Sequence, residues 1–349
     1  MKVLVVGGAG YVGSVLVRGL LEKGYDVKVL DRLYFGDRGI KDLLEEIELL
    51  VCDMRRITPS ILEDVDAVIN VGGLSNDPTA EYNPKANFQM NTIASSKLAQ
   101  MCRETGVKRY IFASTCSIYD RGVLDSEADI VLSENSPVFP KAAYSLSKFE
   151  AERRILALSS DDFCPVILRK GTIFGFSPRM RYDLVVNTFV KDAFSKGYLT
   201  LFMCGEMWRP LVEVRDVTRA YIAALEADER EVKGQIFNVS YRNFRISELA
   251  LRVRDALREI GMDVDIRLDR KPRTVRSYRV SNKKIKERLS FEAKIPVEES
   301  VTEMIRSIKE YGYTDFENPI YYNIRWMKLI EKTQGDVFEI GGYSYDRRG

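Results

Sequence analysis

The chain opens with Lys2-Val3-Leu4-Val5-Val6-Gly7, followed at once by Gly8-Ala9-Gly10-Tyr11-Val12-Gly13. The first run is apolar after its lysine, which predicts a strand buried on both faces. The second is a glycine turn, after which residues 12–23 have the apolar spacing of a helix and residues 27–30 read as a second strand. A strand, a turn, a helix and a strand make a βαβ unit, so the N-terminus predicts a parallel sheet.

The alternation of strands and helices continues along the chain. Further strands are predicted at residues 67–71, 109–113, 166–169 and 235–239, and helices at residues 91–105 and 145–159. We therefore expect an α/β fold, a Rossmann-type doubly wound parallel sheet with a smaller C-terminal substrate lobe. The predicted division assigns residues 1–168 and about 212–241 to the nucleotide-binding domain, about 170–211 and 242–315 to the lobe, and 316–349 to a C-terminal extension.

Composition excludes several classes of function. The 349 residues carry 53 basic and 51 acidic side chains, a balance that argues against a nucleic-acid surface. No apolar run reaches the roughly 18 residues of a membrane span, so we expect a cytoplasmic protein with no membrane partner. The chain has no histidine, which excludes Ser-His-Asp and Cys-His catalysis and removes the commonest metal ligand. We expect no metal, and acid-base chemistry must come from Tyr, Lys or carboxylates.

The glycine turn carries the first chemical signal. Gly7, Gly10 and Gly13 are spaced so that a backbone can approach a pyrophosphate at the start of a helix. Asp31 ends the second strand 21 residues after Gly10 and is placed to accept hydrogen bonds from ribose hydroxyls and to repel a 2′-phosphate. These features predict NAD as cofactor, although Arg32 weakens the preference over NADP. The alternative is a tight turn with no ligand.

A second signal combines three side chains. Tyr144 and Lys148 lie four residues apart in a helical pattern, so both project from one face. A phenol, with a reference pKa near 10, can act as a base at neutral pH only beside positive charge, which Lys148 would supply. The spacing alone also occurs for structural reasons. Thr115 strengthens the chemical reading because it follows the predicted strand 109–113, at the carboxyl edge where ligands of such sheets bind.

Together these motifs resemble the extended short-chain dehydrogenase/reductases of the NAD-dependent epimerase/dehydratase family, most similar to nucleotide-sugar 4-epimerases, over residues 1 to about 313. Residues 53–55, 112–119 and 168–175 also match family segments. The resemblance implies that Thr115, Tyr144 and Lys148 are catalytic. It implies that the cofactor is bound by Gly7, Gly10, Tyr11, Val12, Gly13, Asp31, Arg32, Asp53, Met54, Gly72, Gly73, Tyr144 and Lys148.

The resemblance also implies a nucleotide-diphosphate sugar as substrate. Arg209 and Arg276 match arginines that contact the diphosphate, and their forked donors suit that group, although surface salt bridges are the alternative. Asn187 lies where family members place a substrate-binding amide. Thr172 replaces the asparagine that is usual in the family, so the substrate of the related enzymes cannot be assigned directly to this chain. Thr115 would also contact the sugar.

The residues after the catalytic threonine distinguish the reactions of the family. Related dehydratases carry an acidic pair there, whereas this chain has Cys116 and Ser117. We therefore expect epimerisation, at carbon 4 by the resemblance, with NAD unchanged overall. The alternatives are a nucleotide-sugar reductase, oxidase or dehydratase of the same family, or a non-catalytic NAD-binding regulatory protein. The resemblance further implies a homodimer through helices near residues 91–105 and 145–159; a monomer is the alternative.

Overall fold

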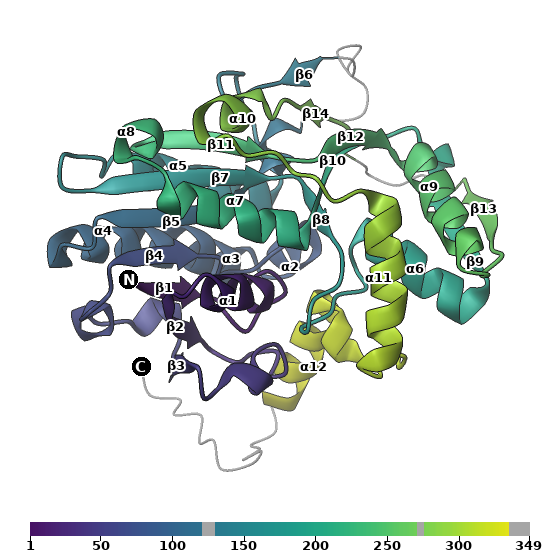
Figure 1. Cartoon of the computed structure of the whole chain (residues 1–349), viewed down its shortest axis with the longest axis horizontal. Helices are drawn as coiled ribbons and strands as arrows, with labels where there is room; N and C mark the ends of the chain where they lie inside the picture. Colours follow the sequence, from purple (N-terminus) through teal and green to yellow (C-terminus); the bar gives the residue numbers. More distant parts are fainter. Residues whose placement is uncertain (121–129, 271–275, 335–349) are drawn as a thin grey trace.

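The computed structural model describes residues 1–120, 130–270 and 276–334. Its centre is a sheet of seven parallel strands in the order β11-β7-β5-β4-β1-β2-β3 (Figure 1). The strands are β1 (Lys2–Val6), β2 (Asp26–Asp31), β3 (Ile47–Val51), β4 (Ala67–Asn70), β5 (Arg109–Thr115), β7 (Cys164–Lys170) and β11 (Gln235–Val239). The chain winds outward from β1 in both directions, which confirms the predicted doubly wound fold and places a crevice where β1 meets β4.

Helices cover both faces of this sheet. On one face α1 (Gly13–Glu22) packs against α7 (Val214–Glu226), and their apolar side chains share one buried core with β1 and β5. On the other face α4 (Ser95–Thr105) and α5 (Ala143–Leu156) bury theirs against β4, β5 and β7. Because both faces are covered, the central strands are continuous apolar runs, as β1 is.

The observed elements differ from the predicted ones at their ends. Strand β5 continues two residues beyond the predicted 109–113 and ends at Thr115, so this threonine lies on the carboxyl edge itself. The predicted helix 91–105 consists of a π-helical turn, Gln89–Ala94, that runs into α4. Strand β3 was not predicted, because its five residues are only partly buried at the edge of the sheet and have no strong alternation.

The lobe has its own core and two small sheets. Its elements are β8 (Thr172–Phe174), α6 (Val185–Lys196), β9 (Tyr198–Phe202), β10 (Trp208–Glu213), β12 (Arg242–Arg245), α9 (Ile246–Glu259), β13 (Asp265–Asp269) and α11 (Val297–Glu310). Strands β12, β10 and β8 form one sheet, and β13 and β9 the other. Strand β11 belongs to the large sheet and α7 packs against it. The predicted division into two domains stays a prediction.

Short helices and strands complete the fold. They are helices α2 (Asp77–Tyr82), α3 (Pro84–Phe88), α8 (Glu229–Val232) and α10 (Lys283–Leu289), and the paired strands β6 (Val131–Leu132) and β14 (Arg279–Val280). In the part of the chain that the structure describes, no helix is both long and apolar enough to span a membrane.

The last helix, α12 (Asn323–Gln334), runs back toward the large sheet (Figure 1). The indole Nε1 of Trp326 donates a hydrogen bond to the carbonyl of Tyr34, after β2, at 2.5 Å. Farther along, the hydroxyl of Tyr82 at the end of α2 donates to Glu331 at 2.6 Å. Helix α12 therefore joins two segments that lie on different sides of the β1/β4 crevice.

Candidate active site

A cavity of about 580 Å³ lies between the carboxyl ends of the central strands and the lobe. Every residue predicted to bind the cofactor lines it, and so do Thr115, Thr172 and Arg276. The walls come from the glycine turn, the ends of β2, β4, β5 and β7, the start of α5, residues 179–184 and α12. Segments far apart in the sequence thus meet in one place.

The glycine turn is close-packed and accepts no larger residue at two positions. A Cβ on Gly13 would lie 2.0 Å from the carbonyl oxygen of Gly7, and one on Gly7, whose φ is +82°, would lie 2.7 Å from Cα of Gly72. At Gly10 the only neighbour of an added Cβ is the Gly7 carbonyl, at 3.2 Å. The turn therefore presents bare backbone to the cavity, as a dinucleotide diphosphate requires.

Asp31 is held in place by backbone donors. Its Oδ2 accepts a hydrogen bond from the Ala9 N–H at 3.0 Å and its Oδ1 one from the Leu33 N–H at 2.8 Å. Burial raises the pKa of this carboxyl group, and the backbone hydrogen bonds oppose the shift. Arg32 beside it forms an ion pair of 3.5 Å with Asp53. Since that pair offsets the charge of Arg32, the site suits ribose hydroxyls and agrees with NAD.

Thr115, Tyr144 and Lys148 all line the cavity. Burial raises the pKa of Tyr144 to about 12, while the charge of Arg181 and a hydrogen bond with Thr115 act to lower it. Burial also lowers the pKa of Lys148 to about 7, and Glu152 opposes that shift. The Lys148 ammonium lies 4.7 Å from the centre of the Phe112 ring. The phenol therefore stays protonated at neutral pH in the site as it stands, and further positive charge is needed to make it a base.

The structure separates the four predicted substrate residues of the lobe into two groups. Thr172 and Arg276 line the cavity, whereas Arg209 and Asn187 do not. The Arg209 guanidinium donates to the carbonyls of Trp208, at 2.9 Å, and of Arg276. It therefore supports the segment that carries Arg276 and is not itself at the cavity wall. Arg276 forms ion pairs with Asp77 and, at 3.6 Å, with Asp120.

Asn187 corrects the sequence-based expectation most clearly. Its side chain is fully buried, its Oδ1 accepts from the Gly175 N–H at 3.0 Å, and its Nδ2 donates to the Arg181 carbonyl at 2.9 Å. The same amide lies 3.2 Å from the Tyr11 hydroxyl. Because these contacts use the donors and the acceptor of the amide, Asn187 fixes the path of residues 175–181 and does not line the cavity.

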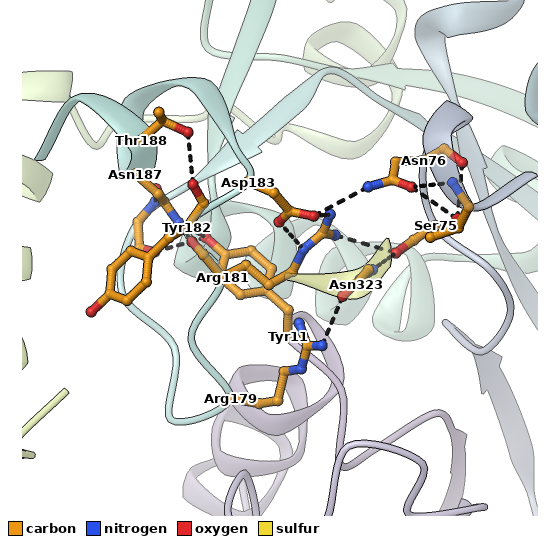
Figure 2. Close-up of polar contacts among 12 residues, drawn as sticks. Tyr11, Ser75, Asn76, Arg179, Arg181, Tyr182, Asp183, Asn187, Thr188 and Asn323 are labelled. Carbon is orange, nitrogen blue, oxygen red and sulfur yellow. Dashed lines mark hydrogen bonds and ion pairs between the residues drawn. The ribbon is translucent and has the colours of Figure 1, made fainter. Parts of the chain in front are cut away.

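Arg181 and Asp183 were not among the predicted site residues, although the charge of residues 178–181 was visible in the sequence. Figure 2 shows both side chains between the lobe and the segment that contains Ser75. The guanidinium of Arg181 donates to Asp183 through Nε at 2.8 Å and through Nη2 at 3.0 Å, and to Ser75 at 3.2 Å. Only the fold reveals that this pair lines the cavity with Tyr144.

Lys170 is a second unpredicted residue of the lining. It is the partner of Thr115 in the pairing of β7 with β5, and its ammonium donates to the Tyr221 hydroxyl at 3.0 Å. Burial lowers its pKa well below the usual value, and the charge of Lys148 acts in the same direction. Helix α12 supplies further unpredicted lining residues, namely Asn323, Ile324, Met327 and Glu331.

Comparison with known proteins gives one family match and many relatives. The model of the NAD dependent epimerase/dehydratase family matches residues 3–240. A UDP-glucose 4-epimerase of Lactobacillus helveticus is 29% identical over 274 residues, covering 72% of this chain and 82% of that protein. UDP-glucuronic acid decarboxylase 1 of Xenopus tropicalis is 28% identical over 233 residues, covering 65% of this chain. The match spans only 54% of that decarboxylase, about half its length.

Solved structures give the same picture of the fold. A UDP-glucose 4-epimerase of Thermotoga maritima, crystallised with UDP-glucose, superposes with a TM-score of 0.78 at 24% identity, covering 89% of this chain and 99% of the other. The dTDP-glucose 4,6-dehydratase DesIV of Streptomyces venezuelae, with NAD bound, gives 0.76 at 24% identity, covering 90% and 99%. Since an epimerase and a dehydratase match equally well, the likeness concerns the fold and leaves the reaction open.

Proposed function

Because this chain belongs to the NAD dependent epimerase/dehydratase family and uses NAD, we propose that it epimerises a nucleotide-diphosphate sugar, at carbon 4, through a transient 4-keto sugar. The observation that carries the proposal is the meeting of Thr115, Tyr144 and Lys148 in one cavity with the glycine turn. The relatives named for UDP-sugars support a nucleotide sugar as the substrate class.

The three side chains have complementary roles in this proposal. Thr115 donates to or accepts from the reacting sugar hydroxyl and holds it toward the phenol oxygen of Tyr144. Tyr144 takes the hydroxyl proton as the 4-keto sugar forms and returns it when the sugar is reduced again. Lys148, one turn farther along α5, supplies positive charge that favours the phenolate. When bound, NAD supplies the hydride acceptor and, in its oxidised form, a positive charge beside the phenol.

The carboxylates of the cavity favour epimerisation over elimination of water. Where related dehydratases carry an acidic pair, Cys116 is fully buried with its thiol against the Arg169 carbonyl at 3.1 Å, and Ser117 contributes only a hydroxyl. Among the described lining residues, each carboxylate already has a partner, as shown by Asp31 with Ala9, Asp53 with Arg55, Asp77 with Arg276, Asp183 with Arg181 and Glu331 with Tyr82. A sugar next to Thr115 therefore meets Tyr144 as its acid-base group.

The substrate diphosphate has one proposed contact in the lobe. Arg276 lines the cavity on the segment that Arg209 supports, and its forked donors suit a diphosphate. Thr172 stands nearby on β8 at the position where the family usually has an asparagine.

Replacing Tyr144 with Phe tests the proposal directly. We expect turnover of the sugar to fall by about 10²- to 10⁴-fold, the usual contribution of acid-base catalysis, while NAD stays bound. Tyr25→Phe, which removes a surface hydroxyl bonded to Glu226, is the matched control and should keep full activity. Substantial turnover by Y144F would overturn the assignment. Stoichiometric consumption of added NAD or NADH would instead indicate an oxidase or a reductase.

A further inference from the structure

Arg179 is a buried cation in the cavity that has no carboxylate partner among the described residues. Its side chain is only 5% exposed, and its guanidinium carbon lies 3.8 Å from the centre of the Phe35 ring. Its Nη2 donates to Oδ1 of Asn323 at 2.7 Å, but its Nε has no hydrogen-bond partner among the described residues. Within the same residues, no carboxylate oxygen lies within 4 Å of this guanidinium, and the residue lines the cavity.

Arg181, two residues farther along, provides an internal comparison. Its charge is matched by two hydrogen bonds to Asp183, as Figure 2 shows, whereas Arg179 in the same view reaches only the amide of Asn323. Burial lowers the pKa of Arg179 to about 9, so the side chain still carries its charge at neutral pH. Asp183 and Asp31 act on this charge only from a distance. Because a buried charge without a directly paired carboxylate is costly, this arrangement indicates that an anion completes the site.

The position of Arg179 identifies which anion is within reach. Arg179, Ser14 and Ala9 all lie around Gly39. A Cβ added to Gly39 would be 3.2 Å from Cβ of Arg179, 3.1 Å from Cβ of Ser14 and 2.7 Å from the carbonyl oxygen of Ala9. Arg179 therefore stands beside the glycine turn and the first turn of α1. It also lies close enough to Asp31 for that carboxylate to act on its pKa. Residues 10–13 of the turn and Arg179 both line the cavity.

We propose that Arg179 binds the diphosphate of NAD from the lobe side, opposite the glycine turn. The cofactor is then held between both parts of the fold, and it neutralises the buried guanidinium. A guanidinium suits this ligand because its planar fork can donate two parallel hydrogen bonds to a phosphate. The inference rests on NAD as the cofactor of the proposed function but not on which sugar or carbon reacts.

Asn323 acts as the positioning residue for Arg179. Its Oδ1 accepts from Arg179, and its Nδ2 donates to the Ser75 hydroxyl at 3.0 Å (Figure 2). Asn323 is the first residue of α12, which Trp326 joins to the segment after β2. Through this one amide, the C-terminal helix aligns a cofactor-binding side chain of the lobe with the loop that follows β4.

Calorimetric titration of the nucleotide-free full-length chain with ADP-ribose and with adenosine tests the proposal. ADP-ribose carries the diphosphate and adenosine does not. We expect Arg179→Met to weaken ADP-ribose and NAD at least tenfold and to leave adenosine unchanged. The control is Arg38→Met, because Arg38 also contacts the C-terminal segment, through Tyr321 at 3.1 Å, but does not line the cavity. This control should keep both affinities, and melting temperatures should show that both variants are folded.

Two further variants separate charge from packing. Arg179→Lys should recover part of the ADP-ribose affinity, because it keeps the charge and loses the fork. Asn323→Asp should weaken ADP-ribose as Arg179→Met does, because the new carboxylate pairs with the intact arginine. Equal weakening of ADP-ribose and adenosine, or no change in either, would overturn the proposal. A loss of affinity confined to NADP would also overturn it, because Arg179 would then contact the 2′-phosphate of the ribose and not the diphosphate. Failure of the epimerase assignment would appear in turnover and leave these affinities untouched.

Discussion

The carboxylate of Glu152 accepts hydrogen bonds from the guanidinium of Arg169 in the interior of the protein, from Nε at 3.0 and 3.2 Å and from Nη2 at 2.6 Å. Both side chains are almost completely buried. Glu152 follows Tyr144 and Lys148 at successive intervals of four residues on α5, so the three share one helix face. The pair ties α5, which carries Tyr144 and Lys148, to β7, the strand beside the one that ends at Thr115.

Glu152→Gln should destabilise the protein by about 3 kcal/mol, because it leaves the guanidinium of Arg169 buried without a counter-charge. Urea unfolding followed by circular dichroism measures this change. Glu150→Gln on the same helix removes an exposed partner of Arg154 and should cost at most about 1 kcal/mol. Equal effects of the two substitutions would show that the buried pair does not anchor α5.

Arg181→Gln should shift the pH dependence of catalysis upward. The charge of Arg181 lowers the pKa of Tyr144, so its removal raises that pKa, and the unpaired Asp183 acts in the same direction. Since Tyr144 must lose its proton to act as a base, the rising limb of kcat/KM against pH moves to higher pH. At neutral pH the rate then falls about tenfold for each unit of the shift. Arg181→Lys, which keeps the charge, should leave the midpoint close to that of the wild type. A uniform loss across the pH range would indicate a purely structural residue.

We expect the homodimer to form through the face that contains α5 and the helical segment, from the end of α3 through the π-helical turn, that leads into α4. Phe88, Ile93 and Leu146 are large apolar side chains that are 41%, 42% and 47% exposed there. In light scattering we expect the wild type to have twice the chain mass of 39.9 kDa, and Leu146→Glu to have the mass of one chain. Leu251→Glu changes an equally exposed leucine on α9 and should stay dimeric. A monomeric wild type would exclude this dimer.

The N-terminal half of the site could be predicted because its signals are local. The glycine turn and Asp31 lie within one βαβ unit, and the four-residue spacing of Tyr144 and Lys148 places both on one helix face. The position of Thr115 could be predicted from the end of the strand that precedes it. Each of these positions is defined by a local element, so the sequence pattern alone is enough to predict where its side chain lies.

The lobe half was predicted less well because its contacts join distant segments. Asn187 occupies the expected position along the chain, but its amide is used by Gly175 and Arg181 inside the lobe. Conversely, the guanidinium of Arg179 lies in the cavity wall and donates to Asn323, 144 residues later. No local sequence pattern predicts a contact between residues so far apart in the chain, and the family resemblance ended before residue 323.

The most direct measurement is proton NMR of the purified protein with NAD and a panel of UDP-, dTDP- and GDP-sugars in heavy water. The account predicts that one sugar converts to its 4-epimer without deuterium at carbon 4, because the hydrogen removed from that carbon returns to it and does not exchange with solvent. Deuterium at carbon 3 or carbon 5 would contradict the account, because it would indicate enolisation and hence a different epimerase or a dehydratase.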